Sequence, residues 1–244
     1  MLLDRYSVWQ ATTLLKSVTQ WYNQYSFASI VQALARYCSV ELSAHYLDMS
    51  KDRLYVEHAQ GVARRSAQTA QYYILTMLNQ MIAPLIPFTA EDVFLAKPYA
   101  ATERSVHLQR FMTLKAPIIG EPALWEMLGQ LREKVLQEIE KLRATGSIKH
   151  SLEAALYFND FSGSDYEALC GMLVKVLGSQ TIESFFKEWF IVSQCFLSVD
   201  LGTSDLFVSV RPAQGIKCPR CWHWFLMEEA HQELCSRCSQ VIQK

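Results

Sequence analysis

The first part of the chain carries a repeated helical pattern. Apolar residues recur at steps of three and four, the spacing that lines one face of a helix. This pattern predicts helices over 4–25, 27–46 and 62–83, the last ending where Pro84 disfavours helical backbone in the residue before it. The expected buried stripes are Leu14, Val18, Trp21 and Tyr25 in the first helix, Phe27, Val31, Leu34, Cys38, Leu42 and Tyr46 in the second, and Ala67, Ala70, Ile74, Met77 and Met81 in the third.

A short fourth helix is predicted next, because Thr89 offers an N-cap with Asp92 three residues later. No convincing strand accompanies these helices. The pattern therefore predicts a mainly α fold that starts with a helical bundle over 1–120, in which the apolar stripes face one another.

A connecting helix and a small α/β domain are predicted over 121–213. Pro122 can occupy the first turn of a helix that ends at Gly146. Beyond it, apolar residues alternate around 152–158 and 207–210, as is typical of strands, while 166–176 has helical spacing and 189–192 resembles a buried strand. The stripe of the connecting helix is Leu124, Leu128, Leu131, Val135, Ile139 and Leu142.

Composition places the chain among soluble globular proteins, since 50% of its 244 residues are hydrophobic and 19% are charged. Its formal net charge of −1 provides no global field for a polyanion, so any nucleic-acid binding must rest on a local patch. The first residues lack the apolar core of a secretory signal, and no apolar stretch is long enough to span a bilayer. We expect a cytoplasmic protein with no membrane partner.

The last residues carry the strongest chemical pattern. Cys218 and Cys221 form one hook, and after thirteen intervening residues Cys235 and Cys238 form another. Two such hooks can place four thiolates at the corners of a tetrahedron, the arrangement of a closed structural zinc site. The sequence therefore predicts a zinc-ribbon-like module over 214–244 with one structural Zn²⁺. The remaining cysteines, Cys38, Cys170 and Cys195, are expected to be buried thiols in a reducing compartment.

Alternatives to this site remain open at the level of sequence. The cysteines could form disulfides or stay unliganded, and His223 or His231 could replace one of them. Trp224 and Phe225 are expected to fill the small core of the module. Trp222 could do the same, or, with Arg220 beside it, offer a stacking face next to positive charge, as single-stranded bases require.

These motifs together resemble the bacterial isoleucyl-tRNA synthetase family. CPRCWH at 218–223 is similar to the C-terminal zinc motif of that family. Five further motifs are similar to the anticodon-binding domain of that family and follow in the same order: FASIVQAL at 27–34, YLD at 46–48, KDRLY at 51–55, RRSAQTA at 64–70 and APLIPFTAE at 83–91. In addition, SLEA at 151–154 resembles its connecting segment. The resemblance covers nearly the whole chain.

The resemblance implies a helical domain and a zinc module that hold the anticodon arm of isoleucine tRNA. It also implies catalytic and editing domains upstream in the same ligase, which attaches isoleucine to its tRNA with ATP, and a monomeric protein. The His-Ile-Gly-His and Lys-Met-Ser-Lys-Ser loops of the catalytic domain do not occur here. We therefore expect no catalytic residues in this chain and no activity of the chain alone.

A basic cluster supports RNA contact in the helical part. Lys51, Arg53, Arg64 and Arg65 stand at the end of one predicted helix and the start of the next. As a group they suit phosphate contacts, although each could simply be solvated, or Arg53 could pair with Asp52 or Glu57. The predicted tRNA-binding residues are Lys51, Arg53, Arg64, Arg65, Arg220 and Trp222.

Two other classes of protein compete with this interpretation. Some DNA repair glycosylases carry a similar four-cysteine finger, but they need an N-terminal proline amine and an adjacent acid, whereas this chain begins Met1-Leu2-Leu3. A free-standing zinc-containing RNA-binding or scaffold protein without an attached ligase is the second alternative, and the sequence does not exclude it.

Overall fold

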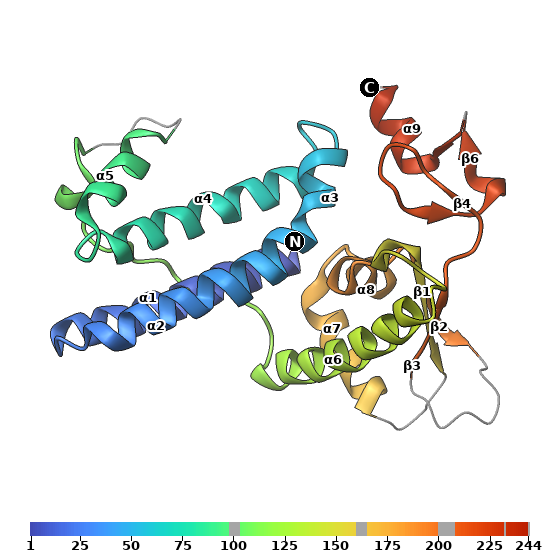
Figure 1. Ribbon diagram of the computed structural model, residues 1–244, viewed down its shortest axis with the longest axis horizontal. Coiled ribbons are helices and arrows are strands. Elements are labelled where there is room, and N and C mark those ends of the chain that lie inside the picture. Colours follow the sequence, from blue (N-terminus) through green and yellow to red (C-terminus); the bar gives the residue numbers. More distant parts are fainter. Residues whose placement is uncertain (98–102, 160–164, 200–207, 232, 244) are drawn as a thin grey trace. The chain divides into compact units, whose positions relative to one another are not determined.

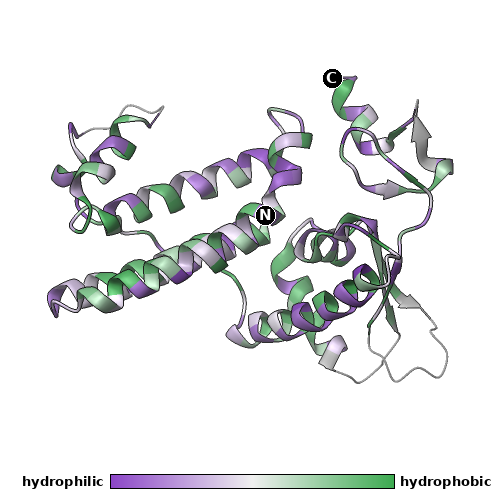
Figure 2. Cartoon of the chain, viewed as in Figure 1, coloured by the Kyte–Doolittle hydropathy of each residue, from purple (hydrophilic) through white to green (hydrophobic). Residues whose placement is uncertain are grey.

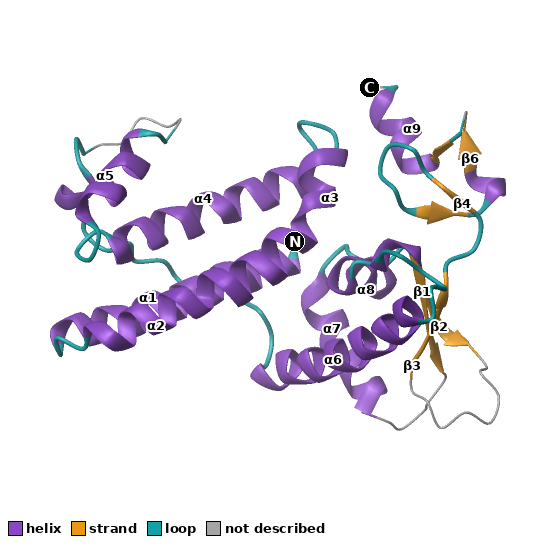
Figure 3. Ribbon diagram, in the orientation of Figure 1, coloured by secondary structure: helices purple, strands orange, loops and turns teal. Residues whose placement is uncertain are grey.

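The computed structural model describes residues 1–97, 103–159, 165–199, 208–231 and 233–243. The chain forms two compact units, one of Met1–Asp48 with Arg65–Ile119 and the other of Met49–Arg64 with Gly120–Lys244. Among the described residues, strands occur only in the second unit (Figure 1, Figure 3). The predicted mainly α fold, with a helical part, a small α/β part and a cysteine-rich terminal module, is confirmed.

Long helices dominate the first unit. They are α1 (Leu2–Asn23), α2 (Phe27–Arg36), a π-helical stretch (Tyr37–Leu47), most of α4 (Val62–Ile82), and α5 (Pro87–Leu95), followed by a short 3-10 turn (Val106–Leu108). The predicted stripe of α4 is confirmed, since all five of its residues are buried. In Figure 2, hydrophilic residues (purple) and hydrophobic residues (green) alternate along the ribbon of α4. No helix in the described part of the chain combines the length and apolarity needed to cross a membrane.

The predicted stripe of the second helix is wrong in part. Phe27 and Val31 are exposed at 47% and 54%, whereas Ile30 and Tyr37 are buried beside the correctly predicted Leu34. Both misassigned residues lie in the regular helix α2, whose buried face runs through Ile30, Leu34 and Tyr37 and not through the neighbouring apolar positions. The next residues, Tyr37–Leu47, wind as a π-helix, in which Tyr46 is buried as predicted. Cys38 falls on the outer side and is exposed, contrary to its expected burial.

The start of α5 also differs from the prediction. The helix begins at Pro87, with Ile86 as its N-cap, and Thr89 lies inside the first turn. Proline is well suited to this position because its missing N–H would have no partner within the helix. The fourth helix therefore exists as expected, but proline rather than a threonine cap sets its beginning.

The second unit contains a three-stranded sheet and its helices. Strand β1 (Ala154–Asn159) lies between β2 (Gln194–Val199), which runs parallel to it, and β3 (Val208–Pro212), which runs antiparallel. Helices α6 (Pro122–Ala144), α7 (Asp165–Leu177) and α8 (Ile182–Phe190) accompany the sheet (Figure 1). Phe158 of β1 stacks on Tyr166 of α7 and Phe186 of α8, so the core lies between sheet and helices.

The stripe of the connecting helix is confirmed, because five of its six predicted residues are buried and Leu142 is half-buried. The strand predicted over 189–192 is wrong. Trp189 and Phe190 are the last residues of α8, and Ile191 takes a left-handed conformation with φ of 57° that ends the helix. The parallel strand β2 begins only at Gln194, so the apolar run belonged to a buried helix end.

Candidate metal centre and nucleic-acid interface

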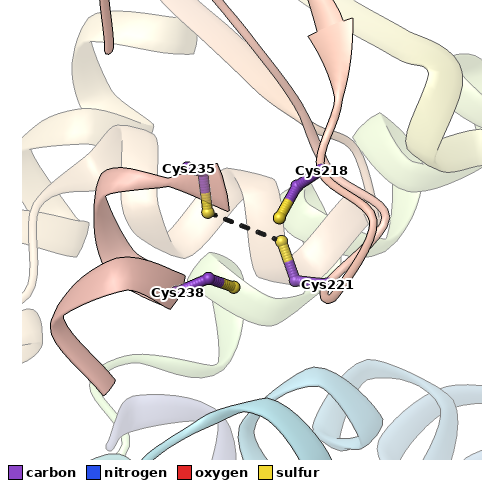
Figure 4. Close-up of side chains that lie close together, drawn as sticks. All are labelled: Cys218, Cys221, Cys235 and Cys238. Carbon is purple, nitrogen blue, oxygen red and sulfur yellow. Dashed lines mark hydrogen bonds between the residues drawn. The ribbon is translucent and has the colours of Figure 1, made fainter. Parts of the chain in front are cut away.

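The terminal module consists of two short hairpins and a helix. Strands β4 (Ile216–Lys217) and β5 (Trp224–Phe225) pair around the first cysteine hook. The second hook lies between the pair β6 (Ala230–His231) and β7 (Leu234–Cys235) and helix α9 (Ser236–Ile242). In Figure 4 the two hooks face each other, with Cys218 and Cys221 opposite Cys235 and Cys238.

Backbone hydrogen bonds close the first hook into a tight turn over residues 218–223, here called the knuckle. The Trp222 N–H donates to the Cys218 carbonyl, and the Cys218 N–H donates to the His223 carbonyl, both at 2.9 Å. Gly215 precedes this turn with φ of +95°, and a Cβ there would lie 2.0 Å from the Phe225 carbonyl oxygen. Only glycine allows the two strands to approach this closely at the base of the hook.

The sulfur geometry fits a tetrahedral metal ion. The four Sγ atoms lie within 4.8 Å of one another, and those of Cys221 and Cys235 are 3.7 Å apart. A zinc ion with Zn–S bonds near 2.3 Å has sulfur atoms about 3.8 Å apart along each tetrahedral edge. The distance of 3.7 Å is also far from the roughly 2.0 Å of a disulfide bond.

A bound cation would stabilise the thiolate form of the four cysteines. Burial raises the pKa of the Cys218 thiol, but backbone N–H groups of Cys221, Cys235 and Arg220 hydrogen-bond the sulfur and lower that pKa to about 6. Burial raises the pKa of both Cys221 and Cys235. Several thiolates so close together repel one another, and a bound divalent cation would offset that repulsion. The residues present therefore fit the implied zinc ion.

The neighbouring aromatic residues divide between core and surface. Phe225 is buried and packs with the four cysteines, and Trp224 is half-buried. The Nε2 atom of His223 lies 3.5 Å from Oδ1 of Asp52, so this ring is directed to a carboxylate outside the cluster. The His231 side chain lies outside the described residues.

Trp222 is the exposed aromatic residue of the knuckle. It is 61% exposed and has a positive φ of 67°, a conformation that costs energy for a residue with a Cβ. The Lys217 ammonium lies 5.2 Å from the centre of its ring. The arrangement presents an aromatic face beside a positive charge, which suits a nucleic-acid base next to its phosphate. Lys217 was missed at the level of sequence, although it directly precedes the first hook.

The arginines of the two hooks are turned toward α3 (Asp48–Val56). Arg220 donates to the Val56 carbonyl at 2.7 Å and to Sγ of Cys238 at 3.4 Å. Arg237 binds Asp52 through both guanidinium nitrogens, at 2.5 and 2.7 Å. Burial raises the pKa of the Asp52 carboxyl, but hydrogen bonds with His223 and Arg237 outweigh it and hold that pKa well below its usual range.

The residues of the predicted basic cluster differ in exposure and in the partners they contact. Arg53 is only 5% exposed, and its Nε lies 2.5 Å from Oε1 of Glu188 of α8, an acidic residue that was not considered at the level of sequence. Lys51 and Arg65 are exposed. Arg64 is half-buried and donates to the Glu57 carbonyl at 3.2 Å.

Comparison with known proteins assigns the class. Residues 4–158 match the family model described as the anticodon-binding domain of tRNA ligase, and the chain belongs to this family. Residues 215–241 match a second model, described as the zinc finger found in FPG and IleRS. The finger alone occurs in more than one class of protein, so the match over 4–158 is the one that favours a tRNA ligase over a repair glycosylase.

Two similar curated proteins bear the same name. The isoleucine–tRNA ligase of Fervidobacterium nodosum is 35% identical over 252 residues, and that of Thioalkalivibrio sulfidiphilus is 36% identical over 249 residues. In both cases the alignment covers 98% of this chain and 26% of the relative. The chain therefore spans about a quarter of the length of the curated relatives it matches, and it is homologous to that part of isoleucine–tRNA ligases.

Proposed function

We propose that this chain is the C-terminal, anticodon-binding part of an isoleucine–tRNA ligase and that it binds the anticodon arm of isoleucine tRNA. The observation that carries the proposal is the succession of an anticodon-binding domain over 4–158 and a zinc finger over 215–241. The relatives are named for attaching isoleucine to tRNA. In this proposal catalytic and editing domains elsewhere in the same ligase perform that reaction with ATP, and the protein works as a cytoplasmic monomer.

One structural zinc ion completes the module in this proposal. Cys218, Cys221, Cys235 and Cys238 would hold it, and four sulfur ligands leave no position open for water or substrate. The ion would supply folding energy to a segment too small to build a sufficient apolar core. Its role is therefore to fix the knuckle that carries Trp222.

The RNA interface combines charge with stacking. Lys51, Arg64 and Arg65 are proposed to contact phosphates, which supply affinity without base selection. Trp222, with Lys217 beside it, is proposed to stack on a base of the anticodon loop, because single-stranded loops are recognised through splayed bases. Arg53 and Arg220 were predicted as contacts, but the buried ion pair of Arg53 with Glu188 and the hydrogen bond of Arg220 to the Val56 carbonyl favour a supporting role instead.

The chain alone is proposed to be inactive in isoleucine activation. Neither catalytic signature loop occurs in its sequence, so the chain lacks the loops with which the resembling family holds the ATP phosphates. Isoleucine-dependent pyrophosphate exchange by the purified chain would overturn this part. A catalytically competent ligase assayed in parallel serves as the positive control.

Footprinting on isoleucine tRNA tests the proposed interface. The chain should protect the anticodon stem and loop from hydroxyl radicals and leave the acceptor stem open. Uniform protection along the whole tRNA, or equal protection of an unrelated hairpin, would favour the alternative of a free-standing RNA-binding protein. Protection confined to the acceptor stem would contradict both.

A further inference from the structure

Both cysteine hooks carry an arginine at the same place. Arg220 stands directly before Cys221, and Arg237 directly before Cys238. Both guanidinium groups reach α3, a helix remote in sequence: Arg237 lies 185 positions from its partner Asp52. Two equivalent side chains of one metal site therefore hold a single helix.

The two bonds act on different parts of α3. Arg220 donates to the carbonyl of Val56, the last residue of the helix, where carbonyl groups lack partners within the helix and the dipole favours a cation. Arg237 holds the Asp52 side chain one turn earlier with a two-point fork, a geometry that fixes orientation as well as distance. Together they constrain both position and rotation of the helix.

Contacts with the cysteine cluster connect this clamp to the metal site. Arg220 also donates to Sγ of Cys238, and Val56 is buried against the four cysteines and Phe225. The two hooks can therefore fix α3 only while the four cysteines keep their arrangement.

The whole segment 49–64 belongs to the same compact unit as the zinc module. On the α/β side, Arg53 anchors α3 to Glu188. Arg64, which follows α3, is tied back to the Glu57 carbonyl. Lys51 and Arg64, two of the proposed phosphate contacts, therefore sit on a segment whose placement depends on these anchors.

We propose that Asp52 is a positioning residue that couples metal occupancy of the four-cysteine site to the segment 49–64. Metal binding shapes the hooks, the hooks present Arg220 and Arg237, and these hold α3 with its basic residues. The coupling is reciprocal, so that losing the Asp52 fork weakens metal binding. Its consequence for RNA rests on the proposed function above, but the coupling itself does not.

Metal affinity is the first test. Zn²⁺ and Co²⁺ affinities of the full chain are measured by competition with a chromophoric chelator, for wild type, Asp52→Asn and a control, Glu138→Gln. The control removes the carboxylate of an exposed ion pair on α6 with Lys141. Asp52→Asn should bind metal roughly tenfold more weakly, the range seen when outer partners of metal ligands are removed. Equal affinity of Asp52→Asn and wild type would overturn the coupling.

Hydrogen exchange provides a readout on the helix itself. Removing the metal should speed amide exchange across 49–64 while leaving the α4 stripe over 67–81 unchanged, and Asp52→Asn with metal bound should show part of the same increase. Exchange across 49–64 that is independent of metal would contradict the proposal. The Co²⁺–thiolate absorption band of each variant verifies that four sulfurs still bind the ion.

A double-mutant cycle separates coupling from general damage. Asp52→Asn and Arg237→Gln should each weaken metal binding, and the double variant should be no weaker than the worse single one. Additive losses would show that the two residues act separately and would overturn the proposal. If wild type binds no tRNA while metal-dependent exchange over 49–64 persists, the proposed function fails and the coupling stands.

Discussion

Arg53 of α3 and Glu188 of α8 form an ion pair in which Nε and Oε1 are 2.5 Å apart. The side chains are only 7% and 12% exposed, so water screens the pair little. Removing one partner of such a pair leaves the other charged and buried, which is more costly than losing an ion pair at the surface. One of the basic residues predicted to contact RNA therefore stabilises the fold instead.

Replacing Arg53 should therefore destabilise the second unit. We expect Arg53→Ala to lower the free energy of unfolding by about 3 kcal/mol, because the Glu188 carboxylate loses a neighbouring cation while it remains buried. Denaturant unfolding measures the change. Lys134→Ala, at an exposed position on α6, is the control and should shift the free energy by less than about 0.5 kcal/mol. Equal small shifts in both variants would contradict the structural role of Arg53.

Zinc content should depend on the four clustered cysteines and not on the cysteines outside the cluster. Cys235→Ser removes one of the four converging sulfurs, so protein purified without chelator should lose most of its zinc, while the α4 core stays folded. Cys38→Ser changes an exposed cysteine outside the cluster and should keep one zinc per chain. Elemental analysis gives the stoichiometry. Wild-type protein without stoichiometric metal would refute the zinc assignment.

The periodic elements were predictable from the sequence, and the reason is physical. In α4 and α6 one face packs against a core along the whole length of the helix, so apolar residues recur at helical spacing throughout. The failures occurred where the apolar pattern allows more than one interpretation. Helix α2 carries apolar residues on two adjacent faces, of which only the one with Ile30 and Leu34 is buried, and the apolar end of α8 had the same composition as a buried strand.

Part of the candidate site could be predicted and part could not. The four-cysteine cluster follows from its spacing alone. Asp52 was considered as the partner of an arginine, but that this arginine is Arg237 is set by tertiary folding. Nothing local in the sequence distinguishes Glu188, which pairs with Arg53, from other acidic residues. The stacking of Lys217 on Trp222 similarly needs the turn of the knuckle.

Trp222→Gly should separate RNA binding from stability. Glycine accepts the positive φ of this position without strain, so the variant should be at least as stable as wild type. Loss of the ring should cost about 1–3 kcal/mol of tRNA binding energy, roughly 5- to 150-fold in Kd. Leu226→Ala, at another exposed apolar position of the module, should leave binding unchanged. A destabilised variant with unaltered RNA affinity would assign Trp222 to the core.

Phosphate contacts should show in the salt dependence. Arg65→Ala removes an exposed positive charge at the start of α4 and should weaken binding of all tRNAs alike, with a salt slope reduced by about one. Lys16→Ala, at an exposed position of α1, is the matched control and should leave the slope unchanged. Fluorescence anisotropy at several salt concentrations measures both. An unchanged slope in Arg65→Ala would remove this residue from the interface.

The proposed function requires that this chain recognises the anticodon arm of isoleucine tRNA. The most direct measurement is the Kd of the metal-loaded chain for isoleucine tRNA and for the same tRNA with only its anticodon changed, at one fixed salt concentration. Base contacts supply discrimination and phosphate contacts do not, so the native anticodon should bind about tenfold more tightly or better. Equal affinity for the two tRNAs, or no binding of either, would contradict the account.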